Sequence, residues 1–385
     1  MKIVQVTPRF PPAIGGLENH VYNISLELVK RGHQVVVLTS NDVEEVKVVN
    51  EEFMNGIEVY RFPLFLPRLF REGWLMPNLL KMLPTLQADI IHAHSCRCLS
   101  SFIAALLSER RGVPFVLTPH GIFPKRGWFN GLVKSVYDYS LGNILLKFAD
   151  KIIALTESNK SLLLNLGASE LKTVIIGNGV DVEKYRESTR VEVTKRKHGF
   201  LGPVILYVGR VAWHKSLERA IEALPSIVEE FSDAKFVLVG PKYTEESERL
   251  LRLAERLGVE DSIVRTGRVS ESQLHFYYSI ADIFILPSVY EGLSLSMLEA
   301  MASKVPIMVC SSAGVNGILT HGINAFILNN GTKDEISRSI SFLLDRSELR
   351  ETIRQNARGL VIRKYTWTAV VSKLESIYEE LVAAN

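Results

Sequence analysis

Cysteine and long apolar runs are both scarce in this sequence. Only three cysteines occur among 385 residues, and Cys96 and Cys98 lie close together while Cys310 is far along the chain. So few and so unevenly spaced thiols exclude a disulfide framework. No stretch reaches the ~18 uninterrupted apolar residues that a membrane-spanning helix needs, so we expect a soluble protein.

A secretion signal is also lacking. Residues 2–6 form a short apolar run with no small-residue cleavage site after it, which predicts a first strand and a cytoplasmic location. Net charge is low, at +3, yet residues 61–150 hold eleven Lys or Arg against five Asp or Glu. This local excess fits either an acidic partner such as lipid phosphate, at the inner face of a membrane, or ordinary scattered surface charge.

Strand-like and helix-like segments alternate along the whole chain. At roughly 100–200 residues per domain, the length predicts two domains. Short β-branched, apolar runs separate amphipathic stretches, and such alternation is typical of parallel sheets covered by helices on both faces. In the first half these runs are residues 2–6, 34–39, 89–93, 114–118, 151–155 and 173–176, and in the second half residues 204–208, 235–240, 262–266, 282–286, 305–309 and 325–328.

The second series repeats the order of the first. We therefore predict an α/β protein with one Rossmann-like domain over residues 1–181 and another over residues 203–365. A charged segment without apolar periodicity, residues 182–202, is interpreted as the linker. Residues 366–385 carry an apolar helical face that must pack against a surface, and either domain could supply it.

Ligands of open parallel sheets bind at the carboxyl ends of strands, where helices begin. Two turns in the first half meet this description. Gly15 and Gly16 precede the first helix and allow close approach of a phosphate or sugar, although a turn that only punctuates the fold is at least as frequent. His120 follows a buried strand, where it is either a cleft residue or a structural hydrogen-bonding histidine.

In the second domain, the first candidate site residues lie on a basic turn. Gly209 and Arg210 directly follow an apolar strand, and Lys215 comes five residues after Arg210. Arginine offers a planar fork of donors and lysine a mobile point charge, and together they could neutralise a leaving diphosphate. Two solvated surface charges are the alternative interpretation.

The strongest local signal is a pair of glutamates around a small-residue turn. Glu291 ends a loop after an apolar strand, and Glu299 lies about two helical turns further on. Between them, Gly292, Leu293 and Ser294 expose backbone amides at a helix start, where phosphate could bind. One acid could meet sugar hydroxyls and the other a ribose diol, although a capped helix with one solvated and one buried glutamate also fits.

Residues 92–98 offer two histidines and two cysteines at alternate positions, which raises the question of a zinc or copper site. Alternation along one strand places such ligands ~6–7 Å apart on a single face, and this spacing does not close a tetrahedron. Cleft lining is the preferred interpretation.

Taken together, these motifs resemble glycosyltransferase family 4, enzymes of the GT-B fold that transfer a sugar from a nucleotide donor with retention at the anomeric carbon. The resemblance spans nearly the whole chain. Seven motifs occur in the family's order: Gly15-Gly16, residues 31–35, 89–94, 118–121 and 177–181, Gly209-Arg210 with Lys215, and Glu291 with Glu299.

The resemblance implies roles for these residues. Arg210 and Lys215 would hold the donor diphosphate, Glu299 the ribose and Glu291 the donor sugar. His120 would contact that sugar from the opposite, acceptor-side domain, across a cleft between the two domains. The activity would be that of a hexosyltransferase-type glycosyltransferase without cofactor or catalytic metal, because cationic side chains and helix amides replace a divalent ion. Same-face attack on an oxocarbenium-like centre would retain configuration.

The sequence departs from the family pattern at three positions. Ser216 stands where a glycine usually follows the diphosphate lysine, and Ser294 replaces another common glycine. After the next strand the family often has an acid, where this chain has Gly317. A GT-B glycoside phosphorylase and a non-catalytic sugar-nucleotide-binding protein remain as alternatives, although a mere binding protein should lack either the cationic pair or the acid pair.

Two segments bear on the acceptor, which the resemblance leaves open as a glycan, a lipid-linked molecule or a small molecule. Residues 62–75 and 125–129 mix aromatic, aliphatic and basic side chains. Such segments can rest on a membrane surface, which would bring a lipid-linked acceptor to the site. The alternative is that Phe65, Leu66, Leu69 and Trp74 pack into the N-terminal core. No feature indicates nucleic-acid binding.

Overall fold

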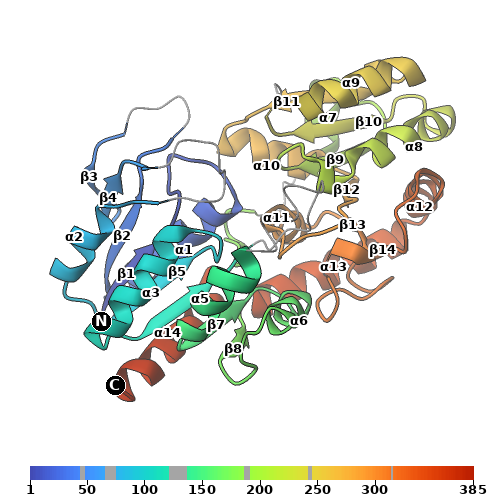
Figure 1. Ribbon diagram of the computed structural model, residues 1–385. Helices are drawn as coiled ribbons and strands as arrows, with labels where there is room; N and C mark the ends of the chain where they lie inside the picture. The colour runs from blue at the N-terminus through green and yellow to red at the C-terminus, as the bar shows by residue number, and fades with distance from the viewer. Residues whose placement is uncertain (44–47, 66–74, 121–136, 186–190, 242–244, 314) are drawn as a thin grey trace. The chain divides into compact units, whose positions relative to one another are not determined.

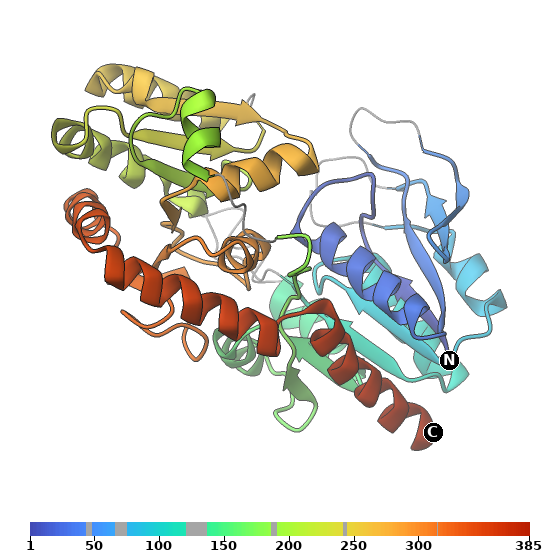
Figure 2. The same ribbon diagram turned by 180° about the vertical axis from the view of Figure 1, so that it is seen from behind.

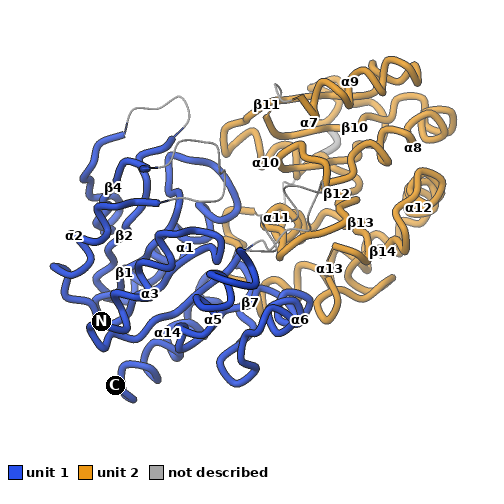
Figure 3. Tube along the Cα trace, in the orientation of Figure 1, with its two compact units in different colours: residues 1–179, 367–385 blue, residues 180–366 orange. Residues whose placement is uncertain are grey.

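The structure is a computed structural model that describes residues 1–43, 48–65, 75–120, 137–185, 191–241, 245–313 and 315–385. The chain forms two compact units, residues 1–179 with 367–385 and residues 180–366 (Figure 3). Each unit is an α/β fold with a mainly parallel sheet and helices on its faces, as expected for the two Rossmann-like halves of the GT-B fold (Figure 1). No bilayer-crossing helix is found among the described residues.

The sheet of unit 1 has the order β3-β4-β2-β1-β5-β6-β7-β8. All neighbouring strands are parallel except β3 and β4. The strands are β1 (Lys2–Val6), β2 (Gln34–Ser40), β3 (Glu51–Met54), β4 (Ile57–Phe62), β5 (Ile90–His94), β6 (Phe115–Thr118), β7 (Lys151–Ala154) and β8 (Thr173–Ile175). The helical segments are α1 (Gly16–Lys30), α2 (Leu79–Met82), η1 (Leu83–Thr85), α3 (Leu99–Arg111), η2 (Asp138–Gly142), α5 (Asn143–Phe148), α6 (Glu157–Asn165) and α14 (Trp367–Ala383).

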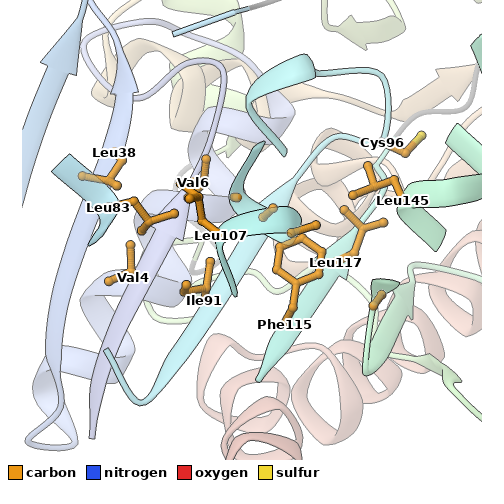
Figure 4. Close-up of a cluster of buried hydrophobic side chains, with 14 of the residues drawn as sticks. Val4, Val6, Leu38, Leu83, Ile91, Cys96, Leu107, Phe115, Leu117 and Leu145 are labelled. Carbon is orange, nitrogen blue, oxygen red and sulfur yellow. The ribbon is translucent and has the colours of Figure 1, made fainter. Parts of the chain in front are cut away.

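Strand alternation divides the core of unit 1 into two layers. Val4 and Val6 of β1 point to the face covered by α2, α3 and α5 (Figure 4). Ile3, on the same strand, packs on the opposite face against α1 and α14. Because side chains of a strand alternate between faces, a fully apolar strand requires helices on both sides.

The C-terminal helix α14 belongs to unit 1. Its apolar face buries Val371, Leu374 and Tyr378 beside Val21 and Ile24 of α1. An ion pair joins Arg31, just after α1, to Glu375 at 2.7 Å. The view from behind shows α14 running beside α1 along this face of the sheet (Figure 2). The chain thus returns to the first unit after completing the second.

Unit 2 is built on a sheet of order β11-β10-β9-β12-β13-β14, with all neighbouring strands parallel. Its strands are β9 (Val204–Val208), β10 (Lys235–Val239), β11 (Ile263–Gly267), β12 (Ile283–Leu286), β13 (Ile307–Cys310) and β14 (Phe326–Leu328). Its helical segments are α7 (Val191–Lys197), η3 (Trp213–Lys215), α8 (Leu217–Glu230), α9 (Glu245–Leu257), η4 (Glu260–Ser262), α10 (Glu271–Ile280), α11 (Leu295–Ala302), η5 (Ser311–Ala313), α12 (Lys333–Asp345) and α13 (Ser347–Lys364).

The segment interpreted as a linker, residues 182–202, is part of unit 2 instead. It contains helix α7, whose Lys195 donates a 2.6 Å hydrogen bond to Asp282, just before β12. Tyr185 is buried and accepts at its carbonyl a hydrogen bond from Arg358 of α13. High charge density without apolar periodicity indicated a linker, but Lys184 and Lys195 form ion pairs within the unit, with Glu271 and Asp282.

Candidate active site

Both sheets have a topological switch point, where the strand order reverses. In unit 1 it lies between β1 and β5, and in unit 2 between β9 and β12. Loops that leave the carboxyl ends of such neighbouring strands diverge to opposite faces and leave room for a ligand. The turns that hold the predicted site residues follow these strands and β6, the neighbour of β5.

The first loop of the unit 2 site follows β9. Gly209 adopts a φ of +151°, which an L side chain rarely adopts. A Cβ at Gly240 would collide with the Gly209 carbonyl oxygen, so two glycines allow these backbones to touch. The Tyr207 hydroxyl donates a 2.8 Å hydrogen bond to the Arg210 carbonyl, which fixes the turn. The Arg210 side chain is exposed, and no hydrogen bond or ion pair is found for it among the described residues.

The second loop follows β12 and meets the first through an ion pair. Lys215 Nζ contacts Glu291 Oε1, and the Ser288 hydroxyl donates to the same oxygen at 2.7 Å. Glu291 is 7% exposed. The backbone N–H of Val289 donates to the His214 carbonyl at 3.0 Å and ties the loops together. The predicted diphosphate lysine and sugar glutamate are therefore brought into direct contact.

His214, next to Lys215 in sequence, is an uncharged histidine. Burial, and then the charge of Lys215, lowers the pKa of His214 to about 4. Next in sequence, Ser216 adopts a φ of 49° in the left-handed region, at the position where the family usually has glycine. A non-glycine residue in this region costs about 1 kcal/mol.

Helix α11 begins directly after the acidic turn. Ser294 is its N-cap, and its hydroxyl accepts a hydrogen bond from the Met297 N–H at 3.3 Å. Leu293 is buried, while Gly292 is half-buried. The serine that replaces a family glycine here supplies a cap that stabilises the helix start.

Glu299 lies on α11 and is held by two tyrosines that the sequence analysis missed. The Tyr278 hydroxyl donates to Glu299 Oε2 at 2.8 Å, and Tyr185 also hydrogen-bonds the carboxylate. Burial raises the pKa of Glu299, and the tyrosine hydrogen bonds oppose that shift. The His275 ring packs edge-on against Tyr185, with a centroid separation of 4.8 Å, and its buried Nε2 has no partner among the described residues. Tyr185 lies in the charged segment that was interpreted as a linker, and Tyr278 follows other aromatic residues, so no sequence signal selected them.

Gly317 stands where the family often has an acidic residue. Gly317 has a φ of 78°, a conformation that strains a glutamate.

In unit 1, His120 belongs to a cluster of four histidines. It follows β6 with a φ of 53°, and its Nε2 lies 3.0 Å from His94 Nδ1. His20 of α1 packs edge-on against His120, with ring centroids 4.9 Å apart. His92 is held by Tyr378 at 2.6 Å and Thr118 at 2.8 Å. Burial lowers the pKa of all four imidazoles, so they are uncharged at neutral pH.

The paired glycines precede this cluster on α1. Gly15 is the residue before the helix and Gly16 its first residue. A Cβ at Gly16 would meet no atom within 4 Å, whereas one at Gly15 would meet the carboxylate of Glu18. The space beside the Gly16 Cα is therefore not filled by described atoms. Gly15, Gly16 and His120 thus lie on unit 1, and the other predicted site residues on unit 2.

Two parts of the sequence interpretation can be compared with the structure. Cys96 and Cys98 are buried and form no disulfide, and His92 uses both ring nitrogens on Tyr378 and Thr118. Phe65 is 68% exposed, so for this residue the alternative of packing into the N-terminal core does not hold. Residues 66–74 and 125–129 lie outside the described residues, as does Gly121.

Comparison with known proteins identifies the family. The model of Glycosyltransferase Family 4 matches residues 14–184, and that of Glycosyl transferases group 1 matches residues 192–360. The chain belongs to glycosyltransferase family 4. It is therefore a glycosyltransferase, and the family predicted from its motifs is confirmed.

Relatives and solved structures extend over the same length. An uncharacterised glycosyltransferase of Methanocaldococcus jannaschii is 29% identical, with 98% of each chain covered. The GPI3 subunit of the Saccharomyces cerevisiae phosphatidylinositol N-acetylglucosaminyltransferase is 23% identical over 98% of this chain and 82% of its own. The structure of Anabaena HepE with UDP-glucose has a TM-score of 0.80 at 19% identity, covering 99% of this chain and all of that one. This last likeness confirms the GT-B fold.

Proposed function

We propose that this chain is a retaining hexosyltransferase that takes its sugar from a nucleoside diphosphate donor without a metal ion. The observation that carries the proposal is the Lys215–Glu291 ion pair at the switch point of unit 2, beside the loop that carries the exposed Arg210. Two cations beside helix amides suit a diphosphate, and the buried carboxylate suits sugar hydroxyls. The bound UDP-glucose of HepE supports a donor of this class.

In the absence of donor, the Lys215–Glu291 pair keeps both charges satisfied. A bound diphosphate would draw Lys215 toward its oxygens and leave Glu291 free to accept from the sugar. Glu299, oriented by Tyr278 and Tyr185, would accept both hydroxyls of the ribose. Each group would therefore act on a different part of the donor.

The reaction itself is tested by its products and its metal dependence. A panel of uridine, guanosine and adenosine diphosphate sugars is offered with and without chelator. We expect a nucleoside diphosphate product and unchanged turnover in chelator. A sugar 1-phosphate formed only with inorganic phosphate would identify a glycoside phosphorylase instead. Turnover that is lost in chelator and restored by Mg²⁺ or Mn²⁺ would contradict metal independence.

The two units should contribute differently to the donor. Glu299→Ala should weaken binding of the nucleoside diphosphate, because it removes the ribose acceptor. His120→Ala should lower turnover far more than nucleotide affinity, since the His120 side chain would contact the sugar rather than the nucleotide. Calorimetry with the nucleoside diphosphate, together with turnover of the intact donor, measures both. The reverse pattern of effects would overturn this assignment.

The acceptor is proposed to be lipid-linked and reached at a membrane surface. Phe65 is exposed beside a basic sequence segment, and the name of the yeast relative includes a phosphatidylinositol acceptor. Aromatic side chains settle at the interface while basic ones meet lipid phosphate.

Co-sedimentation with anionic vesicles measures this contact. We expect binding at low salt that falls as salt screens the charges, and that is lost in Arg68→Glu/Arg71→Glu. The matched control is Arg252→Glu/Arg256→Glu, which makes the same charge change on α9. Absence of binding at low salt would leave a soluble acceptor.

A further inference from the structure

Three histidines of unit 1 converge from three different elements. His20 comes from α1, His94 ends β5, and His120 follows β6. One ring nitrogen from each lies within 4.8 Å of those of the other two. His94 and His20 are almost fully buried, at 0% and 4% exposure, whereas His120 is partly exposed. Among the three, His120 is therefore the most accessible.

In His20 and His94, one ring nitrogen is hydrogen-bonded to a side-chain amide oxygen. His20 Nδ1 lies 2.8 Å from Asn178 Oδ1, and His94 Nε2 lies 2.7 Å from Gln5 Oε1. An amide oxygen accepts only, so each of these ring nitrogens carries the proton. The proton-free nitrogens are then His20 Nε2 and His94 Nδ1. This arrangement is the one in which metal-binding histidines are usually held.

The third nitrogen is His120 Nε2, 3.0 Å from His94 Nδ1. Without a cation, its proton bridges these two nitrogens. When the proton moves to Nδ1 of the same ring, a third lone pair becomes available. Burial lowers the pKa of all three imidazoles, so neutral pH leaves them in the uncharged form that binds metal.

We propose that His20, His94 and His120 form a binding site for a divalent transition-metal cation of the Zn²⁺ type. Three imidazoles with an open fourth position are a ligand set that Zn²⁺ accepts, whereas Mg²⁺ and Ca²⁺ prefer oxygen ligands. Binding of the cation does not depend on the proposed function. The expected effect of the cation on activity does rest on the proposed function. The cation would occupy the His120 nitrogen that is proposed to face the donor sugar, and would thus inhibit transfer.

Cobalt is the probe, because four-coordinate Co²⁺ absorbs visible light and occupies sites of the same type. The intact chain is freed of metal with chelator and titrated with Co²⁺. We expect one equivalent to give ligand-field absorption, which Zn²⁺ then displaces. His20→Gln and His94→Gln should weaken binding by at least tenfold, and Asn178→Leu by about 10–100-fold through its outer-shell hydrogen bond. His198→Gln, an exposed histidine of unit 2, is the control and should bind normally.

A second measurement separates loss of ligands from loss of folding. Thermal unfolding without metal reports whether each variant is folded, and added Zn²⁺ should raise the midpoint of the wild-type chain only when it binds the folded state. Absence of one-equivalent Co²⁺ binding, or equal binding by the histidine variants, would overturn the site. Binding with unchanged transfer would contradict the role of His120 in the reaction and leave the cation site standing.

Discussion

Replacing Arg210 by alanine is expected to lower kcat about 10²–10³-fold while leaving the stability of the protein unchanged. Arg210 is proposed to stabilise the negative charge that develops on the leaving diphosphate. Removing a preorganised group of this kind lowers the rate by this factor, which corresponds to about 3–4 kcal/mol of transition-state stabilisation. Stability should be preserved because the Arg210 side chain is exposed and makes no hydrogen bond or ion pair among the described residues. Initial rates at saturating donor, with thermal unfolding, measure the two effects.

Lys215 is a less selective probe of the same charge. Lys215→Ala would also strand the buried Glu291 carboxylate, so it should cost stability as well as rate. Arg210→Lys should fall between wild type and alanine, because it keeps the charge but loses the planar fork. Arg256→Ala, on the exposed side of α9, is the matched control. An Arg210→Ala enzyme with wild-type kcat would remove this residue from the mechanism.

Strand positions were largely predictable, because a parallel strand buried on both faces leaves a continuous apolar run. The strands expected at residues 2–6 and 204–208 coincide with β1 and β9. The antiparallel pair β3 and β4 was missed because neither strand is a continuous apolar run: β3 alternates between exposed and half-buried residues and β4 between buried and half-buried ones. Asn55 and Gly56, both at positive φ, connect these strands. Asn-Gly between alternating residues is a strong hairpin signal, so this pair was detectable.

Motif residues of the site were also predictable, whereas their supporting contacts were not. Strand-to-helix turns pointed to Glu291 and Lys215, but nothing in their spacing states that they pair. Tyr185 reaches Glu299 from a segment more than a hundred residues earlier, and its neighbours in sequence are charged. His20 and Asn178 are likewise 158 positions apart. Such partners depend on the tertiary fold, so one sequence without related sequences does not reveal them.

Acidification from pH 6.5 to 5.5 is expected to destabilise unit 1 far more than unit 2. Burial lowers the pKa of His20 to about 4 and holds those of His92, His94 and His120 well below 6.5. A histidine whose pKa is lower in the folded state contributes stability that is fully present above the unfolded pKa. That contribution is lost as pH falls below about 6.5, because these histidines then bind protons in the unfolded chain but stay neutral in the folded chain.

The size of the effect follows from the number of such groups. Each histidine contributes about 1 kcal/mol to the loss between pH 6.5 and 5.5, so four contribute about 4 kcal/mol. This is a large share of a typical folding free energy of about 5–15 kcal/mol. In unit 2, burial lowers the pKa of His214 to about 4 and also lowers that of His275. Unit 2 should therefore lose less than half as much stability.

Hydrogen exchange resolves the two units within one chain. Amides of β1 and β5 report on unit 1 and those of β9 and β10 on unit 2, after correction for the intrinsic exchange rate and in the presence of chelator. His20→Asn should reduce the acid loss of unit 1 by about a quarter, because it removes one of four proton-binding groups. His198→Ala, whose side chain is exposed, should not change it. Equal losses in the two units, or constant protection of β1 and β5 down to pH 5.5, would show that the histidine cluster accepts protons without unfolding.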